Sequence, residues 1–293
     1  MRRWFAIAKA TALEIISEPL SFLLMLSALA VAVLAPALHY HQFGEPTRMA
    51  RDAGLSAFFT FGTLFAVIGL FRSFRRELDS GTAQMAISHS VSRAVFLVAK
   101  FSGAMAAYAL FALILSSVSI AMVYGAAVGG AIARQSGDVS RLWGPALAAG
   151  AGTIVLPPMI AAALNRFWRF RFVPTAFFFA LLASVATAAC FFDFRMAMKL
   201  APAWVALAFP VVAYAAAVAA AVVGMKPKYA VAALVALAAL SVPAVGNYYL
   251  ADTFSRGGVV EWGYVALAGL FALPAAGAFL VLGVHFFERR DIA

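Results

Sequence analysis

Apolar stretches long enough to cross a bilayer follow one another along the chain, and they constrain the fold more than any other feature. They run approximately over residues 20–38, 55–71, 96–124, 143–164, 173–192, 201–223, 229–247 and 263–284. A helix needs about 20 apolar residues to cross roughly 30 Å of hydrocarbon. Charged residues make up only 12% of the 293-residue chain, against about 25% in soluble domains. We therefore expect an all-α integral membrane protein, a polytopic helical bundle of about eight spans, because backbone polar groups in lipid must be satisfied internally.

Basic residues indicate the orientation of these spans. With the N-terminus placed in the cytoplasm, 15 of the 22 Lys and Arg residues fall in inner segments and 7 in outer segments. The 12 acidic residues split six and six between the two sides, so the bias is one of positive charge, as the positive-inside rule expects. We expect both termini to be cytoplasmic and the protein to be a multi-pass protein of a cell membrane, such as a bacterial inner membrane. The net charge of +10 does not indicate nucleic-acid binding, because the basic residues sit in short runs between apolar stretches, where they are better explained by membrane topology.

The first 19 residues form a segment of their own. Trp4, Ala8, Ala12 and Ile16 recur every four residues, which is typical of a helix lying in the membrane interface with its apolar side toward lipid. The alternative is a plain extension of the first span. Pro19 favours the interfacial helix, because the residue before a proline is disfavoured in a continuous helix. The apolar run after it is longer than the core of a signal peptide, so we expect an uncleaved first span.

Two later stretches contain residues that disturb a simple span. From residue 96 to residue 133 the chain is nearly uninterrupted in its apolar character, and a helix of this length exceeds the bilayer. Either it projects from the membrane or it breaks near Gly125, Gly129 and Gly130. The spacing of Gly125 and Gly129 also permits close helix packing, which we favour over a functional role. The pair Pro157-Pro158 is expected to kink or interrupt its helix.

Motifs that carry chemistry are missing from the sequence. The acidic residues can be placed in loops or at span ends, so no ion-coupling relay in the middle of the membrane is expected. The sequence contains neither a phosphate-binding loop nor a metalloprotease or nucleophile motif, and such motifs identify the corresponding enzymes. His39 and His41 are a weak metal site at best, and we interpret them as loop residues. We therefore expect no catalytic residue, cofactor or metal in this chain.

The segment from Arg72 to Lys100 is the longest polar interruption. Ser80-Gly81 is expected to end one helix, and Thr82 to cap a short helix that ends near Ser88 and in which Met85 packs. Ser90 and Ser92 then offer cap oxygens for the next long helix. The alternative is a solvated loop. A short, partly apolar helix in the cytoplasm needs a cover, either lipid headgroups or another protein.

This segment resembles a known family. Glu77, then Ser80-Gly81-Thr82, then Ser92-Arg93, then Lys100 is similar to the run that follows the second span in type-2 ABC exporter permeases. The ending at residues 286–292 and the amphipathic helix before the first span are also similar. The chain departs from the family in two respects. Ser90 stands where family members often have Pro, and the family typically has six spans, so the eight stretches would be six plus an extra pair.

The resemblance implies a function and a set of partners. Residues 1–293 would form one transmembrane permease domain, with an interfacial helix at 1–19 and a cytoplasmic coupling segment at 72–100. Two permease chains, identical or different, would pair in the bilayer, and separate cytoplasmic ATP-binding subunits would hold the ATP and Mg²⁺. The implied ATPase-coupling interface consists of Glu77, Ser80, Gly81, Thr82, Met85, Ser92 and Arg93. Two alternatives stay open, a membrane scaffold or assembly protein and a membrane-embedded enzyme or enzyme partner.

Overall fold

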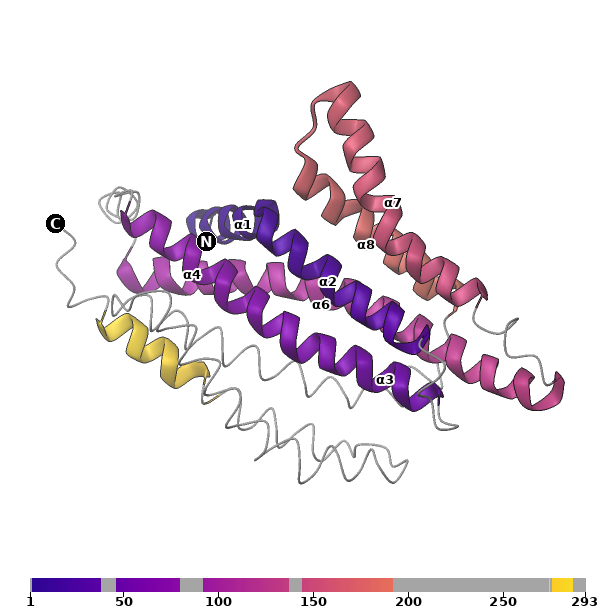
Figure 1. Cartoon of the computed structure of the whole chain (residues 1–293). Coiled ribbons are helices and arrows are strands. Elements are labelled where there is room, and N and C mark those ends of the chain that lie inside the picture. The colour runs from indigo at the N-terminus through magenta and orange to yellow at the C-terminus, as the bar shows by residue number, and fades with distance from the viewer. Residues whose placement is uncertain are drawn as a thin grey trace. The chain divides into compact units, whose positions relative to one another are not determined.

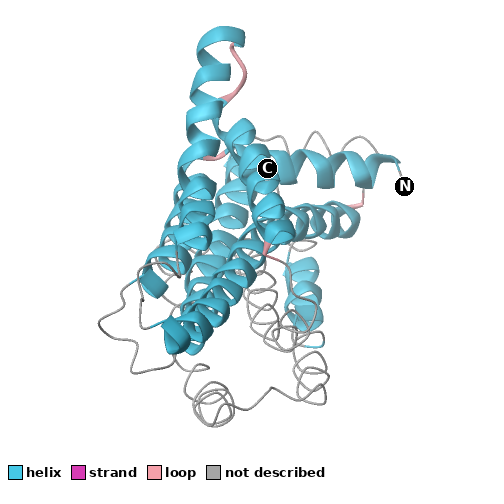
Figure 2. Ribbon diagram, turned by 90° about the vertical axis from the view of Figure 1, so that its right-hand side faces the viewer, coloured by secondary structure: helices cyan, strands magenta, loops and turns pink. Residues whose placement is uncertain are grey.

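The computed structural model describes residues 2–37, 46–79, 92–136, 144–191, 274 and 276–286. Regular structure in these ranges is helical and includes no strand, which confirms the expected all-α class for this part of the chain (Figures 1 and 2). The elements are α1 (Arg2–Ser17), α2 (Pro19–Ala37), α3 (Pro46–Ala57), the π-helix η2 (Phe58–Gly62), α4 (Thr63–Asp79), α6 (Arg93–Ser136), α7 (Gly144–Trp168) and α8 (Phe172–Cys190). A short apolar helix, Ala276–Phe286, follows near the C-terminus.

Three helices in the described part are long and apolar enough to cross a membrane. They are Arg93–Val128 within α6, Pro145–Trp168 within α7, and Phe172–Cys190. A fourth span is added if α1 and α2, which are bent at the break between them, are counted together. These helices support a membrane protein. The full number of spans and the side on which the termini lie stay predictions, because stretches 201–223 and 229–247 lie outside the described residues.

The break between the first two helices occurs where the sequence predicts it. Helix α1 ends at Ser17 and α2 begins at Pro19, where the missing N–H of proline costs no helical hydrogen bond. The expected lipid-facing stripe of α1 is wrong in one respect. Ala8 is buried together with Thr11 and Ile15, whereas Leu13, on the opposite side, is half exposed. Close packing against α4 and α6 covers the face of α1 that carries Ala8, and the opposite face stays exposed.

Helices α6 and α7 both continue through the residues that were expected to disturb them. Helix α6 has 44 residues without a break, about 66 Å at 1.5 Å per residue, so the alternative of a break near Gly125 is wrong. Gly125 serves packing, because a Cβ there would collide with the Cβ of Ala146. Helix α7 contains Pro157 and Pro158 and still runs to Trp168. A kink or an interruption was expected there, and the helix is not interrupted, because each proline removes only one backbone donor.

The helices belong to two compact units. One contains α2, α3, η2, α7, α8 and the part of α6 from Ala109 onward. In this unit α7 and α8 pack side by side (Figure 1), and α2 packs against α3 and α7. The ring of Phe22 in α2 meets those of Phe172 and Phe177 edge to face, at centroid distances of 5.7 and 5.9 Å.

The other unit contains α1 up to Ile15, α4, and α6 up to Tyr108. Two glycines bring its helices together. A Cβ on Gly69 of α4 would lie 2.9 Å from Cγ2 of Ile15, and a Cβ on Gly103 of α6 would collide with the carbonyl oxygen of Ala8. The absence of side chains at these two positions lets α1 approach both helices closely, and this approach positions the site described next.

Candidate functional site

The coupling segment predicted from the sequence is described at its two ends. Glu77 lies in the last turn of α4, and Ser92 and Arg93 lie at the start of α6. Ser80, Gly81, Thr82 and Met85 lie outside the described residues. The structure therefore defines how the two helices that flank residues 80–91 are held, and this base of the coupling segment is the candidate site.

Lys100 is the centre of the site. Its side chain is 0% exposed, although it sits within the apolar sequence of α6. Nζ lies 2.9 Å from Oε1 of Glu77 and donates a second hydrogen bond of 2.9 Å to the hydroxyl oxygen of Ser73. A buried ammonium is strongly disfavoured unless it is paired and hydrogen-bonded, and both partners come from α4. Lys100 thus joins the start of α6 to the end of α4, across the whole coupling segment.

A second carboxylate extends the network to α1. The hydroxyl of Ser73, which accepts from Lys100, donates a 2.6 Å hydrogen bond to Oε2 of Glu14. Nη1 of Arg76 donates to Oε1 of the same carboxylate at 3.3 Å. The Arg76 side chain is 67% exposed, so this ion pair is screened by solvent and contributes little to stability. The network therefore carries two carboxylates and two cations, which balance in charge, and it links three helices through one serine.

The sequence of α4 explains why the three network residues on this helix lie together. Ser73, Arg76 and Glu77 are spaced i, i+3 and i+4, so they share one face of the helix. Gly69 lies one turn earlier on the same face, and Ile15 of α1 fills the space above it. Glu14 precedes Ile15 in α1, so the contact between Ile15 and Gly69 places the Glu14 carboxylate beside Ser73.

Burial raises the pKa of the Glu77 carboxyl above its ordinary value. Desolvation is the largest cause; Lys100 lowers the pKa through its charge and its hydrogen bond, and the negative charge of Glu14 raises it. The ionised form of Glu77 is thus less favourable in the folded protein than in water, even with a lysine beside it. For this carboxyl the cost of desolvation exceeds the attraction of Lys100. Removing one partner of a buried pair is still destabilising, because the other charge stays buried.

The start of α6 is capped as the sequence predicts. The hydroxyl oxygen of Ser92 accepts a hydrogen bond of 3.3 Å from the N–H of Val95, and its carbonyl accepts one of 3.0 Å from the N–H of Phe96. This is the arrangement of an N-cap residue. Of the two serines expected to cap this helix, Ser92 does so, and Ser90 lies outside the described residues.

Sequence reasoning missed Glu14, Ser73 and Arg76 as members of the site, and it treated Lys100 only as part of a motif. Two signals were present. A single lysine with apolar residues on both sides indicates a buried partner, because an isolated charge in such a helix is costly. The spacing of Ser73, Arg76 and Glu77 marks one polar face. Neither signal identifies Glu14, which is 59 residues from Ser73 along the chain.

The network is suited to holding helices together. Within the described ranges, no three His, Cys, Asp or Glu residues gather to hold a metal ion. Both carboxylate oxygens of Glu14 and Oε1 of Glu77 face a cation or a hydroxyl at hydrogen-bond distance. Comparison with known proteins gives no family: no protein-family model, no curated protein and no solved structure matches this chain.

Proposed function

We propose that this chain is the membrane-spanning permease subunit of an ATP-driven transporter of the ABC type, and that residues 72–100 couple it to a separate cytoplasmic ATPase. The observation that carries the proposal is the pair formed by Glu77 and Lys100, which are separated by 23 positions in sequence and 2.9 Å in space. It ties together the two helices from which residues 80–91 emerge. A segment with a fixed base transmits a displacement to those helices, whereas a segment on two independent helices does not.

The network also gives that displacement a route. A push on residues 80–91 acts on the end of α4 and the start of α6, and the Ser73 hydroxyl passes it to Glu14 of α1. Three helices would then move together. The apolar helices of the chain supply the membrane part of such a machine, and the sequence, which has no phosphate-binding loop, leaves ATP hydrolysis to the partner. The proposal includes a second permease chain and a location in a bacterial inner membrane.

The test is site-specific photocrosslinking in cells that make the full-length chain. A photoreactive residue at position 82 is expected to capture a protein that binds ATP, identified by mass spectrometry and labelled by an azido analogue of ATP. The control position is Met159, a side chain of α7 that is 62% exposed, where lipid adducts are expected instead. If position 82 gives only lipid or water adducts, or captures proteins that do not bind ATP, the proposal is wrong.

A further inference from the structure

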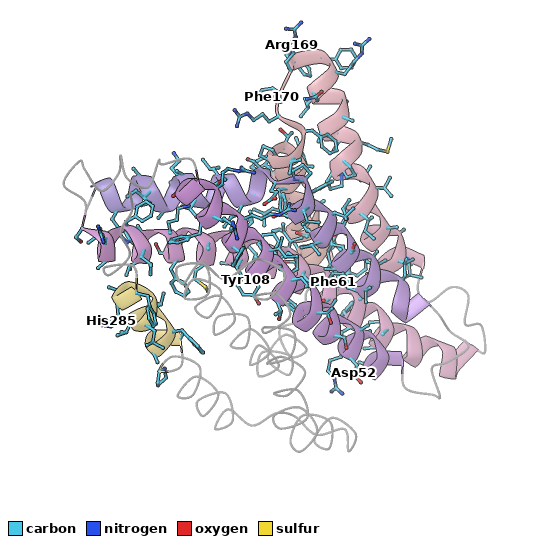
Figure 3. The ribbon with its side chains drawn as sticks, turned by 60° about the vertical axis from the view of Figure 1, so that its left-hand side comes forward. Asp52, Phe61, Tyr108, Arg169, Phe170 and His285 are labelled. Atoms are coloured by element: carbon cyan, nitrogen blue, oxygen red, sulfur yellow. The ribbon has the colours of Figure 1, made fainter. Side chains whose placement is uncertain are left out.

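The connection between α7 and α8 carries a cluster that the proposed function does not use. Six consecutive residues, Arg166–Arg171, comprise three arginines and three aromatic residues interspersed among them, and we name them the basic-aromatic tip. Phe167, Trp168 and Phe170 are 76%, 68% and 56% exposed. Figure 3 shows Arg169 and Phe170 at the free end of the α7–α8 pair. Large aromatic rings exposed together in this way indicate an interaction surface.

Hydrogen bonds fix the conformation of the tip. Arg169 has φ 57°, a left-handed value that non-glycine residues rarely adopt, and its N–H donates to the carbonyl of Asn165 at 3.1 Å. The Asn165 amide in turn donates to the carbonyl of Phe170 at 2.6 Å, and the Thr175 hydroxyl donates to the carbonyl of Arg171 at 2.7 Å. Side chains thus satisfy two carbonyls of the turn, as a connection at the edge of the hydrocarbon requires.

The two helices place the tip at the membrane boundary. Both Pro145–Trp168 and Phe172–Cys190 are long and apolar enough to be spans, with 24 and 19 residues. These lengths correspond to roughly 36 and 28 Å, close to the thickness of a bilayer core. A connection of three residues leaves the tip directly at the level where lipid headgroups begin. Tryptophan and other amphipathic aromatic rings prefer this level.

Charge selects the kind of lipid. The tip carries three arginines, and the sequence contains no Asp or Glu between Asp138 and Asp193. Guanidinium groups bind phosphate through paired hydrogen bonds, and their charge favours headgroups with a net negative charge. We propose that the basic-aromatic tip binds anionic phospholipid headgroups, with its aromatic rings inserted beside them at the top of the acyl chains.

Fluorescence quenching in vesicles tests this inference. The full-length protein is reconstituted with phosphatidylcholine or phosphatidylglycerol brominated near the top of the acyl chains, and the signal of Trp168 is isolated as the difference between the wild type and W168F. We expect stronger quenching of Trp168 by the brominated anionic lipid. Each basic residue near an anionic surface changes binding about fivefold, so R169Q is expected to weaken the preference for the anionic lipid by that factor. The control is K9Q, which replaces an exposed lysine of α1 and is expected to leave the preference unchanged.

Two further arms make the result decisive. A triple variant with Gln at positions 166, 169 and 171 should lose the preference, and a triple variant with Lys should keep most of it. In 1 M salt, where the Debye length is about 3 Å, the wild type should also lose it. Equal quenching by the two lipids in the wild type overturns the inference. This is also the result expected if the natural ligand of the tip is an acidic protein. An unchanged preference in the Gln variant overturns it as well.

Discussion

Nζ of Lys100 lies 2.9 Å from Oε1 of Glu77, and a lysine side chain with 0% exposure thereby joins the first turns of α6 to the last turn of α4. The serine between them, Ser73, connects the same lysine to Glu14 of α1. Because the Lys100 ammonium is buried, α1, α4 and α6 must keep their relative positions for it to retain its hydrogen-bond partners.

Lys100→Met should destabilise the protein markedly. The substitution leaves the carboxylates of Glu77 and Glu14 without the buried cation. Breaking a buried ion pair by removing one partner costs about 3–5 kcal/mol. We expect a loss of about 2–4 kcal/mol, because the Glu77 side chain is 28% exposed. Thermal or denaturant unfolding of the full-length chain in detergent measures the loss.

The matched control is Lys9→Met on α1, whose side chain is exposed and should change stability by less than about 0.5 kcal/mol. The double variant K100M/E77Q should lose less than K100M alone, because the partner left behind is neutral. Equal losses in the single and double variants would show that Glu77 and Lys100 are not coupled.

The raised pKa of Glu77 predicts how stability depends on pH. A carboxyl whose folded-state pKa lies above its ordinary value of 4.5 favours folding most below pH 4.5, and this contribution is lost as the pH rises through the folded-state pKa. Wild-type stability minus that of Glu77→Gln should therefore fall as the pH increases over this window. Melting temperatures of the two proteins, measured in parallel from acidic to neutral pH, test the sign, and a difference that rises with pH would contradict it.

Gly103→Ala should separate α1 from α6. The added Cβ collides with the carbonyl oxygen of Ala8, and backbone cannot yield as a flexible side chain does. Overpacking of this kind costs about 1–3 kcal/mol. Gly152→Ala in α7 is the control, since its Cβ would meet Leu156 Cδ1 at an ordinary 3.7 Å, and replacing a helical glycine stabilises by about 0.5–1 kcal/mol. If both substitutions have the same effect on the unfolding temperature, the close contact at Gly103 is not real.

The sequence predicts this structure best where one residue acts locally. Pro19 separates α1 from α2 and Ser92 caps α6, each for a reason contained in a few neighbouring residues. The glycine spacing predicts close packing at Gly125, but it does not identify Ala146 of α7 as the partner. Pro157 and Pro158 show the limit of such local rules, because α7 continues through two prolines that were expected to kink or interrupt it.

The site depends on contacts that are distant in the chain. Glu77 is identified from the sequence by its motif, but its partner Lys100 comes from another helix, and Glu14 reaches the network only because glycines allow α1 to approach. A pattern within one helix cannot specify which face of another helix it meets. Ala8 was wrongly assigned to the lipid-facing side of α1 for the same reason, since it is buried against α6, which follows much later in the sequence.

Ser92→Ala should weaken the start of α6. The loss of the N-cap hydrogen bond to Val95 costs about 1 kcal/mol, and Ser92→Asn should restore most of it because asparagine is an equally good cap. Hydrogen exchange of the amides in the first turn of α6 measures the effect, and the rest of α6 serves as the internal reference. Equal exchange in all three proteins would show that the cap does not stabilise this turn.

The proposed function requires the ion pair between Glu77 and Lys100 to present residues 80–91 to an ATPase. The direct measurement is the yield of ATP-binding protein captured by a photoreactive residue at position 82, compared between the wild type, E77Q and K100M at equal amounts of folded protein. We predict efficient capture by the wild type and a several-fold loss in both variants. Equal capture in all three proteins, or no ATP-binding protein captured by the wild type, would contradict the proposed function.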